Sequence, residues 1–191
     1  MTRQFAAYPG ETSQTLDAFP VFLQQLPPLL SAQLHDLRSA IMKEACVTVN
    51  VFAEALGEHF EPFLCKYING AVLLKLLNSG NKLIAETANQ CIVNLLFTVQ
   101  SACVIPKLLD EMKSKNPLVR TRIAHFFYLI VTNYRPSLLE KHMQLLEEFL
   151  SVSIKDACAE ARARARRCFH AFKEIMPHRA AHLFNLFDLN T

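Results

Sequence analysis

Histidine and cysteine side chains are the residues of this chain best suited to metal binding or nucleophilic chemistry. His178 and His182 lie four residues apart, which would place two imidazoles on one face of a helix, as in some zinc sites. No glutamate stands in an HExxH arrangement with them, and no third ligand is close in the sequence. With only 4 Gly, the chain also offers no nucleophile elbow or phosphate loop. The sequence therefore predicts a protein that is not an enzyme and that uses no metal or cofactor.

The six cysteines lack the CxxC pairing of zinc knuckles. Most of them occupy apolar positions of helical patterns, where a thiol packs as a small hydrophobic group. We therefore expect all six to be reduced. They are Cys46, Cys65, Cys91, Cys103, Cys158 and Cys168.

The basic residues are the other group with chemical potential. The formal net charge is only +3, which is too small to indicate a nucleic-acid binder by itself. The densest basic run is Arg162, Arg164, Arg166 and Arg167. At 100° per residue these four side chains do not form one helical stripe, because Arg164 points nearly opposite to Arg162 and Arg166. Binding of RNA or DNA is therefore disfavoured.

The elements that position these residues form a regular pattern. A polar turn followed by an amphipathic helix recurs at Leu37-Arg38, Leu83-Ile84, Val119-Arg120 and Ala161-Arg162, in steps of 46, 36 and 42 residues. A repeat of this length is typical of stacked helical hairpins. Because 51% of the residues are hydrophobic and glycine is scarce, the composition also favours helices.

The predicted fold is an all-α solenoid of four antiparallel hairpins plus a terminal helix. Residues 1–15 are polar and predict a flexible arm, and residues 16–191 form the array. Pro27 and Pro28 should kink or split the first helix. The expected hairpins pair 17–34 with 36–57, 60–77 with 83–99, 105–112 with 116–134, and 136–154 with 160–176, and the last helix covers 177–187.

The N-terminal residues 1–14 contain no apolar run that could serve as a signal peptide. No later stretch approaches the 18 or so consecutive apolar residues that a membrane span requires. We therefore expect a soluble cytoplasmic protein without a membrane partner.

Three strings of the sequence resemble helical-repeat proteins of one family. The segment KDACAEARARAR at 155–166 is similar to a HEAT repeat. Together with DLRSAIMKEAC at 36–46 and KNPLVRTR at 115–122, it resembles, in order and spacing, the TOG arrays of CLIP-associating proteins (CLASP). The resemblance spans about 19–187. It implies a flat paddle of HEAT repeats that binds αβ-tubulin or the microtubule lattice through its turns, and thus a cytoskeletal location.

Carried over by position, the resemblance implies a row of tubulin-facing residues on the four turns. A row of basic side chains there would steer an acidic partner to the turns, and the affinity would fall as the salt concentration rises. For Arg38, Arg120 and Arg162 an alternative stays open, because each arginine could instead pair with acidic groups and hold adjoining repeats together. The full set is Leu37, Arg38, Lys43, Ser79, Asn81, Lys82, Lys115, Asn116, Leu118, Arg120, Lys155 and Arg162.

A second hypothesis is an interaction adaptor that does not bind tubulin and that self-associates or docks other cytoskeletal proteins. The resembling TOG domains carry a Trp in the turn of an additional first repeat, and this chain has no Trp. It also has no complete hairpin before Phe19 and no closing partner for its last helix. Unpaired terminal helices would leave apolar surface for docking.

Overall fold

The structure, a computed structural model, describes residues 25–36 and 38–188, with side chains up to Phe184. The predicted arm at 1–15 lies outside the described residues. Within the described part every regular element is helical. None of these helices is both long enough and apolar enough to cross a membrane.

The helices follow one another with short connections. A helical segment at 25–34 runs through Pro27 and Pro28. The later elements are α2 (Ser39–Leu56), the 3-10 turn η1 (Gly57–Phe60), α3 (Glu61–Tyr67), α4 (Leu73–Leu76), α5 (Lys82–Thr98), α6 (Val104–Glu111), α7 (Pro117–Asn133), α8 (Pro136–Glu140), α9 (Met143–Ser153), α10 (Ala159–Ile175) and α11 (Pro177–Asp188).

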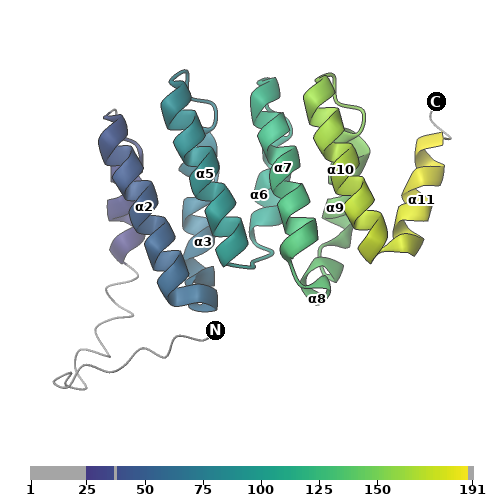
Figure 1. Ribbon diagram of the computed structural model, residues 1–191, viewed down its shortest axis with the longest axis horizontal. Coiled ribbons are helices and arrows are strands. Elements are labelled where there is room, and N and C mark those ends of the chain that lie inside the picture. Colours follow the sequence, from purple (N-terminus) through teal and green to yellow (C-terminus); the bar gives the residue numbers. More distant parts are fainter. Residues whose placement is uncertain (1–24, 37, 189–191) are drawn as a thin grey trace.

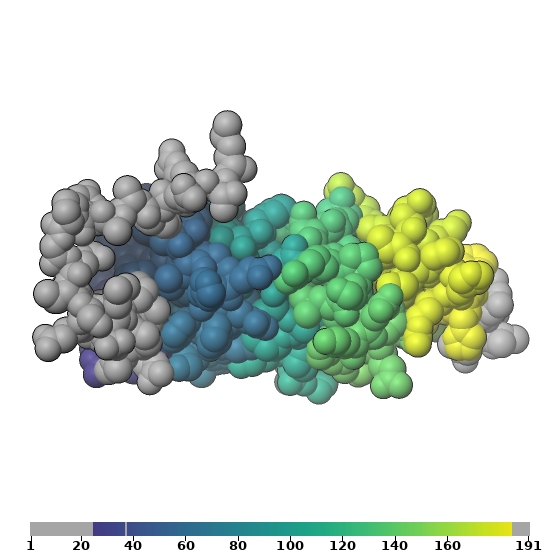
Figure 2. Space-filling model, turned by 90° about the horizontal axis from the view of Figure 1, so that it is seen from below, coloured from purple at the N-terminus to yellow at the C-terminus, as the bar shows by residue number. Residues whose placement is uncertain are grey.

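The helices form two layers along an elongated molecule. The long helices α2, α5, α7 and α10 stand side by side in the front layer, and α3, α6 and α9 lie behind them (Figure 1). Seen from below, the residues follow one another in sequence order along the long axis (Figure 2). This arrangement confirms the prediction of an all-α solenoid built from antiparallel helices.

The core lies between the two layers. Phe127 of α7 and Phe149 of α9 stack with their ring centroids 3.8 Å apart, and both are fully buried. Phe126 is also fully buried, whereas Tyr128 is only partly covered. Because three adjacent residues of a helix point in different directions, the third aromatic ring reaches the surface of the front layer. Packing of large apolar side chains therefore fixes the front helices against the rear ones.

Two predicted helices are interrupted. The helix expected over 136–154 is divided into α8, which ends at Glu140, and α9, which begins at Met143. The sequence pattern favours a single helix over 60–77, but α3 ends at Tyr67 and α4 begins only at Leu73. The Asn69 side chain donates to the Lys66 carbonyl oxygen at 2.5 Å and accepts from the Ala71 backbone N–H at 2.8 Å. Asparagine side chains compete in this way with the helical hydrogen-bond ladder, and Gly70 follows directly. The apolar periodicity alone did not reveal the break.

The expectation that all six cysteines are reduced is wrong for one pair. Cys65 of α3 and Cys103, directly before α6, form a disulfide with 6.2 Å between their Cα atoms. They are 38 residues apart, which is about one repeat, so the stacking brings equivalent positions of neighbouring repeats together. The other four cysteines are free, and Cys46, Cys91 and Cys168 are buried as expected.

Candidate functional site

The turns within the four hairpins lie along one edge of the molecule. They precede the N-termini of α2, α5, α7 and α10, which all point to the same side (Figure 1). We call the described residues of 35–38, 78–83, 113–118 and 154–158 the turn edge. The sequence prediction that the turns form a single row is confirmed by this arrangement.

The second and third turns are built from the same short motif. Asn81 caps α5 by accepting from the Leu83 backbone N–H at 3.0 Å, and Asn116 caps α7 by accepting from the Leu118 N–H at 3.0 Å. Both helices thereby satisfy one of their free N-terminal N–H groups. Ser79 accepts in turn from the Asn81 N–H at 3.2 Å. These polar residues therefore hold the shape of the turns, in addition to any contact with a partner.

Three lysines form the outer layer of the turn edge. Lys82, Lys115 and Lys155 come from the second, third and fourth turns, and all three are exposed. Among the described residues none of them has a side-chain hydrogen bond or an ion pair. Leu83 and Leu118 stand beside the first two lysines, each with 59% of its surface exposed. The edge thus presents unpaired ammonium groups next to apolar side chains.

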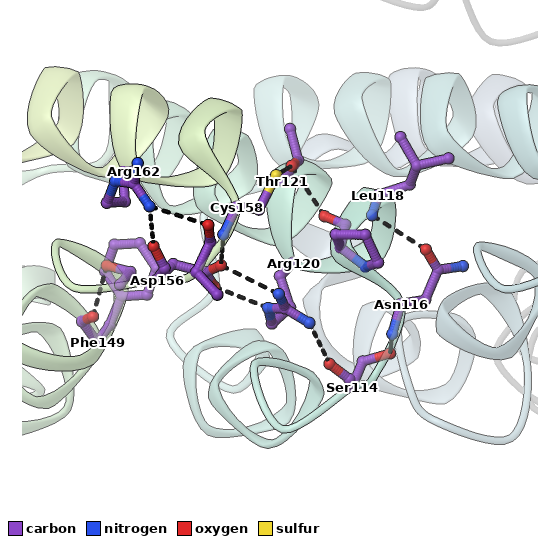
Figure 3. Close-up of polar contacts among 12 residues, drawn as sticks. Ser114, Asn116, Leu118, Arg120, Thr121, Phe149, Asp156, Cys158 and Arg162 are labelled. Atoms are coloured by element: carbon purple, nitrogen blue, oxygen red, sulfur yellow. Dashed lines mark hydrogen bonds and ion pairs between the residues drawn. The ribbon is translucent and has the colours of Figure 1, made fainter.

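An arginine–aspartate pair joins the third and fourth turns and is much less exposed than these lysines. Arg120 Nε approaches Asp156 Oδ2 at 2.7 Å and Arg120 Nη2 approaches Oδ1 at 3.0 Å, with side-chain exposures of 16% and 5% (Figure 3). Arg120 Nη1 also donates to the Ser114 carbonyl oxygen at 2.8 Å. The two-pronged pair joins the third turn to the fourth. Arg120 holds the pKa of the Asp156 carboxyl below its usual range, and Asp156 raises the pKa of Arg120.

Arg162 supports the fourth turn from within. Its Nη1 donates to the carbonyl oxygens of Asp156 at 2.6 Å and Ala157 at 2.9 Å (Figure 3). Asp156 itself accepts from the Cys158 backbone N–H at 2.7 Å, although α10 begins two residues later than an Asp156 cap would place it, with Cys158 in the N-cap position. Both guanidinium groups are therefore engaged within the chain. Arg120 pairs with an acidic group of the next turn, which is the alternative that the sequence left open, whereas Arg162 bonds carbonyl oxygens of its own turn. Contact of either arginine with a partner stays a prediction.

The first turn is held by a local pair. Arg38 donates to Asp36 through its backbone N–H at 2.8 Å, and their charged groups meet at 2.9 Å, with 74% of the Arg38 side chain exposed. These hydrogen bonds lower the pKa of Asp36 to about 2. Leu37 lies outside the described residues. Lys43 is exposed on α2, where it lines a groove shared with α5, so it is not part of the turn edge.

Two polar links between repeats were missed by the sequence reasoning. Asn116 Nδ2 donates to Asn78 Oδ1 at 2.7 Å, which joins the third turn to the second. Arg122 of α7 donates to the Leu77 carbonyl oxygen at 3.1 Å and pairs with Glu86 of α5 at 3.0 Å. No sequence signal identifies these partners, because they lie 36 to 45 residues apart.

Leu83 was also missed, but the sequence contained a signal for it. The strings SGNKL at 79–83 and SKNPL at 114–118 share serine, asparagine and leucine at matching positions. Because Leu118 was already a candidate, the repeated string would have added Leu83. The structure gives both leucines the same exposure.

Comparison with solved structures defines the class of the protein. A chain from the structural study of microtubule plus-end tracking by XMAP215, CLIP-170 and EB1 superposes with a TM-score of 0.69 at 17% identity, covering 92% of this chain and 80% of that one. A chain from the work on crescerin, which uses a TOG domain array to regulate microtubules in the primary cilium, gives 0.65 at 20% identity, covering 93% and 70%. The fold is that of a TOG-type HEAT-repeat domain.

Sequence comparison then gives the family. The family model described as CLASP N terminal matches residues 11–191. A CLIP-associated protein of Arabidopsis thaliana is 32% identical over 172 residues, and CLIP-associating protein 1-A of Xenopus laevis is 29% identical over 175 residues. These matches cover 89% and 87% of this chain but only 12% of each relative. The chain belongs to the CLASP N-terminal family.

Proposed function

We propose that the chain is a non-catalytic microtubule-associated module that binds αβ-tubulin through its turn edge. The observation that carries this proposal is the set of three exposed lysines without partners in the described chain, held on one edge by capped turns. The family match and the TOG-type fold support tubulin as the partner. The contact set consists of Lys82, Lys115 and Lys155, with Leu83, Leu118 and Arg38 beside them.

The geometry suits an acidic protein surface. Ammonium groups that are free of internal partners can form new ion pairs without breaking old ones, so they steer encounter and fix register. Covering the exposed apolar surface of the neighbouring leucines would add favourable free energy to binding. Ser79, Asn81 and Asn116 contribute through the shape of the turns. Arg120 and Arg162 act beneath the contact surface, and Lys43 lies outside it.

The test is binding to tubulin by a variant with all three lysines reversed. The triple variant Lys82→Glu, Lys115→Glu, Lys155→Glu should lose co-elution with tubulin and pelleting with microtubules, while its thermal unfolding stays unchanged. A matched control reverses Lys66, Lys141 and Lys173, which are exposed on α3, after α8 and on α10. Equal binding by the two variants would remove the turn edge from the interaction.

A second candidate function is an interaction adaptor that is indifferent to tubulin. A mainly apolar groove of about 370 Å³ lies between α10 and α11, and Phe184 on its border has 54% of its surface exposed. Such a surface favours self-association or docking of another protein. Sedimentation velocity distinguishes the two candidates, because a tight dimer that ignores tubulin would favour the adaptor.

The proposed place of action is the microtubule cytoskeleton in the cytoplasm. This follows from the proposed partner and from the family, in which the relatives are described as CLIP-associating proteins. A fluorescent fusion of the chain should decorate microtubules in cells, and the triple lysine variant should be diffuse. If both fusions decorate microtubules, the location of the chain does not depend on the turn-edge lysines.

A further inference from the structure

A second basic site lies on the front face of the solenoid, in the groove between α7 and α10. The groove has a volume of about 310 Å³. From α7 it is lined by His125 and Tyr128, and from α10 by Glu160, Ala163, Arg164 and Arg167. These residues belong to the helix bodies and not to the turn edge, so the groove is a separate surface.

Two aromatic rings form one wall of the groove, and an arginine covers it. The rings of His125 and Tyr128 are stacked at 6.2 Å between centroids. The Arg167 guanidinium carbon lies 5.4 Å from the centroid of the Tyr128 ring. Such stacking holds a guanidinium in place and leaves its N–H groups available as donors. Arg167 has no ion pair within the described chain, and it is exposed.

The second arginine has a partner that can be exchanged. Arg164 pairs with Glu160, one helical turn away, at 3.0 Å, and the two side chains are 38% and 59% exposed. Exposed pairs of this kind contribute little to stability. An incoming carboxylate can therefore take over the Arg164 guanidinium at low cost. The groove then offers two guanidinium groups against one lining carboxylate.

His125 lies within the field of the two arginines. Burial lowers the pKa of its imidazole, and the charges of Arg164 and Arg167 lower it further. An anion placed between the two arginines would offset their charge and raise the pKa of His125, so this pKa reports whether an anion is bound in the groove.

We propose that this groove binds a short acidic peptide segment, with glutamate or aspartate carboxylates on Arg164 and Arg167. Arginine forms two parallel hydrogen bonds to a carboxylate, and the rings of His125 and Tyr128 provide an apolar wall for the methylene groups of the peptide. The site is independent of the proposed tubulin contact, because none of its residues belongs to the turn edge.

The charge distribution favours a peptide over a nucleic acid. Glu160 and Glu174 lie on the same side of α10 as the two arginines, because the spacings along 160, 164, 167 and 174 are four, three and seven residues. One glutamate precedes the arginines and the other follows them. The positive zone is therefore limited to the middle of α10. A nucleic-acid backbone needs a longer basic track, whereas one or two carboxylates fit this length.

The test uses hexaglutamate as the probe and hexaglutamine as its uncharged control. At low ionic strength, hexaglutamate should bind in a fluorescence or calorimetric titration, and the pKa of His125, followed by NMR, should rise on binding. The variant with Arg164→Gln and Arg167→Gln should bind at least tenfold more weakly. Arg166→Gln is the matched control, because Arg166 is exposed next to them on another side of α10, and it should change the affinity less than twofold.

Two further comparisons separate this site from the others. The variant with Lys82, Lys115 and Lys155 changed to glutamine should still show the His125 response, even if it loses tubulin binding. Arg167→Lys keeps the charge but loses the planar fork, and it should weaken hexaglutamate severalfold. An unchanged His125 pKa with saturating hexaglutamate, or equal affinities of the double variant and Arg166→Gln, would overturn the proposal. So would binding of inorganic phosphate or an oligonucleotide at this groove without binding of hexaglutamate.

Discussion

The outer and inner layers of the turn edge carry the same charge but differ in exposure and in their partners within the described chain. Lys82, Lys115 and Lys155 are exposed and have no ionic partner within the described chain. Arg120 and Arg162 lie just beneath them, and their guanidinium groups are occupied by a carboxylate or by turn carbonyl oxygens. The comparison shows that the sign of a charge near a turn does not determine whether the charged group is free or is engaged within the fold.

The difference follows from the chemistry of the two side chains. A guanidinium presents its donors in a fixed plane, so Arg120 can hold both oxygens of Asp156 and a carbonyl oxygen at once. An ammonium on a flexible stem is a strongly hydrated point charge, which suits contacts that form and break. Arg120 therefore fixes the third turn relative to the fourth, and Arg162 braces the fourth turn internally.

The largest effect should come from breaking the inner layer. Asp156→Ala leaves the Arg120 guanidinium without its carboxylate in a mostly buried site, so we expect a loss of about 3 kcal/mol in the free energy of unfolding. Urea denaturation measures this change. The control is Asp110→Ala, which breaks an exposed pair with Lys113 and should cost less than about 0.5 kcal/mol. If the two variants lose similar amounts of unfolding free energy, the buried Arg120–Asp156 pair contributes no more to stability than the exposed pair.

The second effect should come from the outer layer and should leave stability unchanged. Changing Lys82, Lys115 and Lys155 to glutamine should weaken tubulin binding by about tenfold or more, which corresponds to ~1.4 kcal/mol. The affinity of the original chain should fall as salt rises, and this dependence should be smaller in the variant, because fewer charges take part. A salt dependence that is identical in both proteins would show that these lysines lie outside the contact.

The third effect concerns the acid stability of the inner layer. The pKa of Asp156 is lowered in the folded chain, mainly by its hydrogen bonds with Arg120. Its carboxylate therefore stabilises the fold above the unfolded pKa of about 4, and this contribution is lost as the pH falls through the folded-state value. Urea midpoints measured from pH 6 to pH 3 should fall less steeply in Asp156→Asn than in the original chain. Parallel curves would contradict the assigned role.

The smallest effect should come from the exposed leucines of the outer layer. Leu118→Ser removes apolar surface that is 59% exposed, so the stability of the fold should change by less than about 0.5 kcal/mol. Tubulin binding should weaken by roughly 1 kcal/mol if the side chain is covered in the complex. Val152→Ser is a control of similar exposure on α9. Its tubulin affinity should equal that of the original chain.

Most of the helices could be predicted from the sequence because the spacing of the apolar residues is regular. The start of α7 and the end of α2 were predicted as bounds of the ranges 116–134 and 36–57. Both follow from local chemistry, because Asn116 caps α7 with Pro117 in its first turn and Gly57 ends α2 with a φ of 54°. The break after Tyr67 was not, because the Asn69 side chain replaces the helical hydrogen bonds without changing the apolar pattern. The Cys65–Cys103 pair depends on stacking between repeats and was missed for that reason.

The candidate site was predicted in position but not in detail. Turn spacing predicted that the turns with Lys82, Lys115 and Lys155 form one row, and the N-termini of α5, α7 and α10, which follow these turns, lie on one side of the molecule (Figure 1). The ion pair of Arg120 with Asp156 could not be derived from the sequence. The two residues are 36 positions apart, and only the stacking of adjacent repeats brings them together. Local motifs therefore located the turns, and long-range packing decided which of their charges stay free.

Chemical footprinting of the lysines tests the central claim most directly. Acetylation rates of every lysine should be measured by mass spectrometry, with and without tubulin. Lys82, Lys115 and Lys155 should react quickly in the free chain and become protected in the complex, whereas Lys66, Lys141 and Lys173 should react equally in both. Protection of the second group, or unchanged rates at the first, would contradict a tubulin contact through the turn edge.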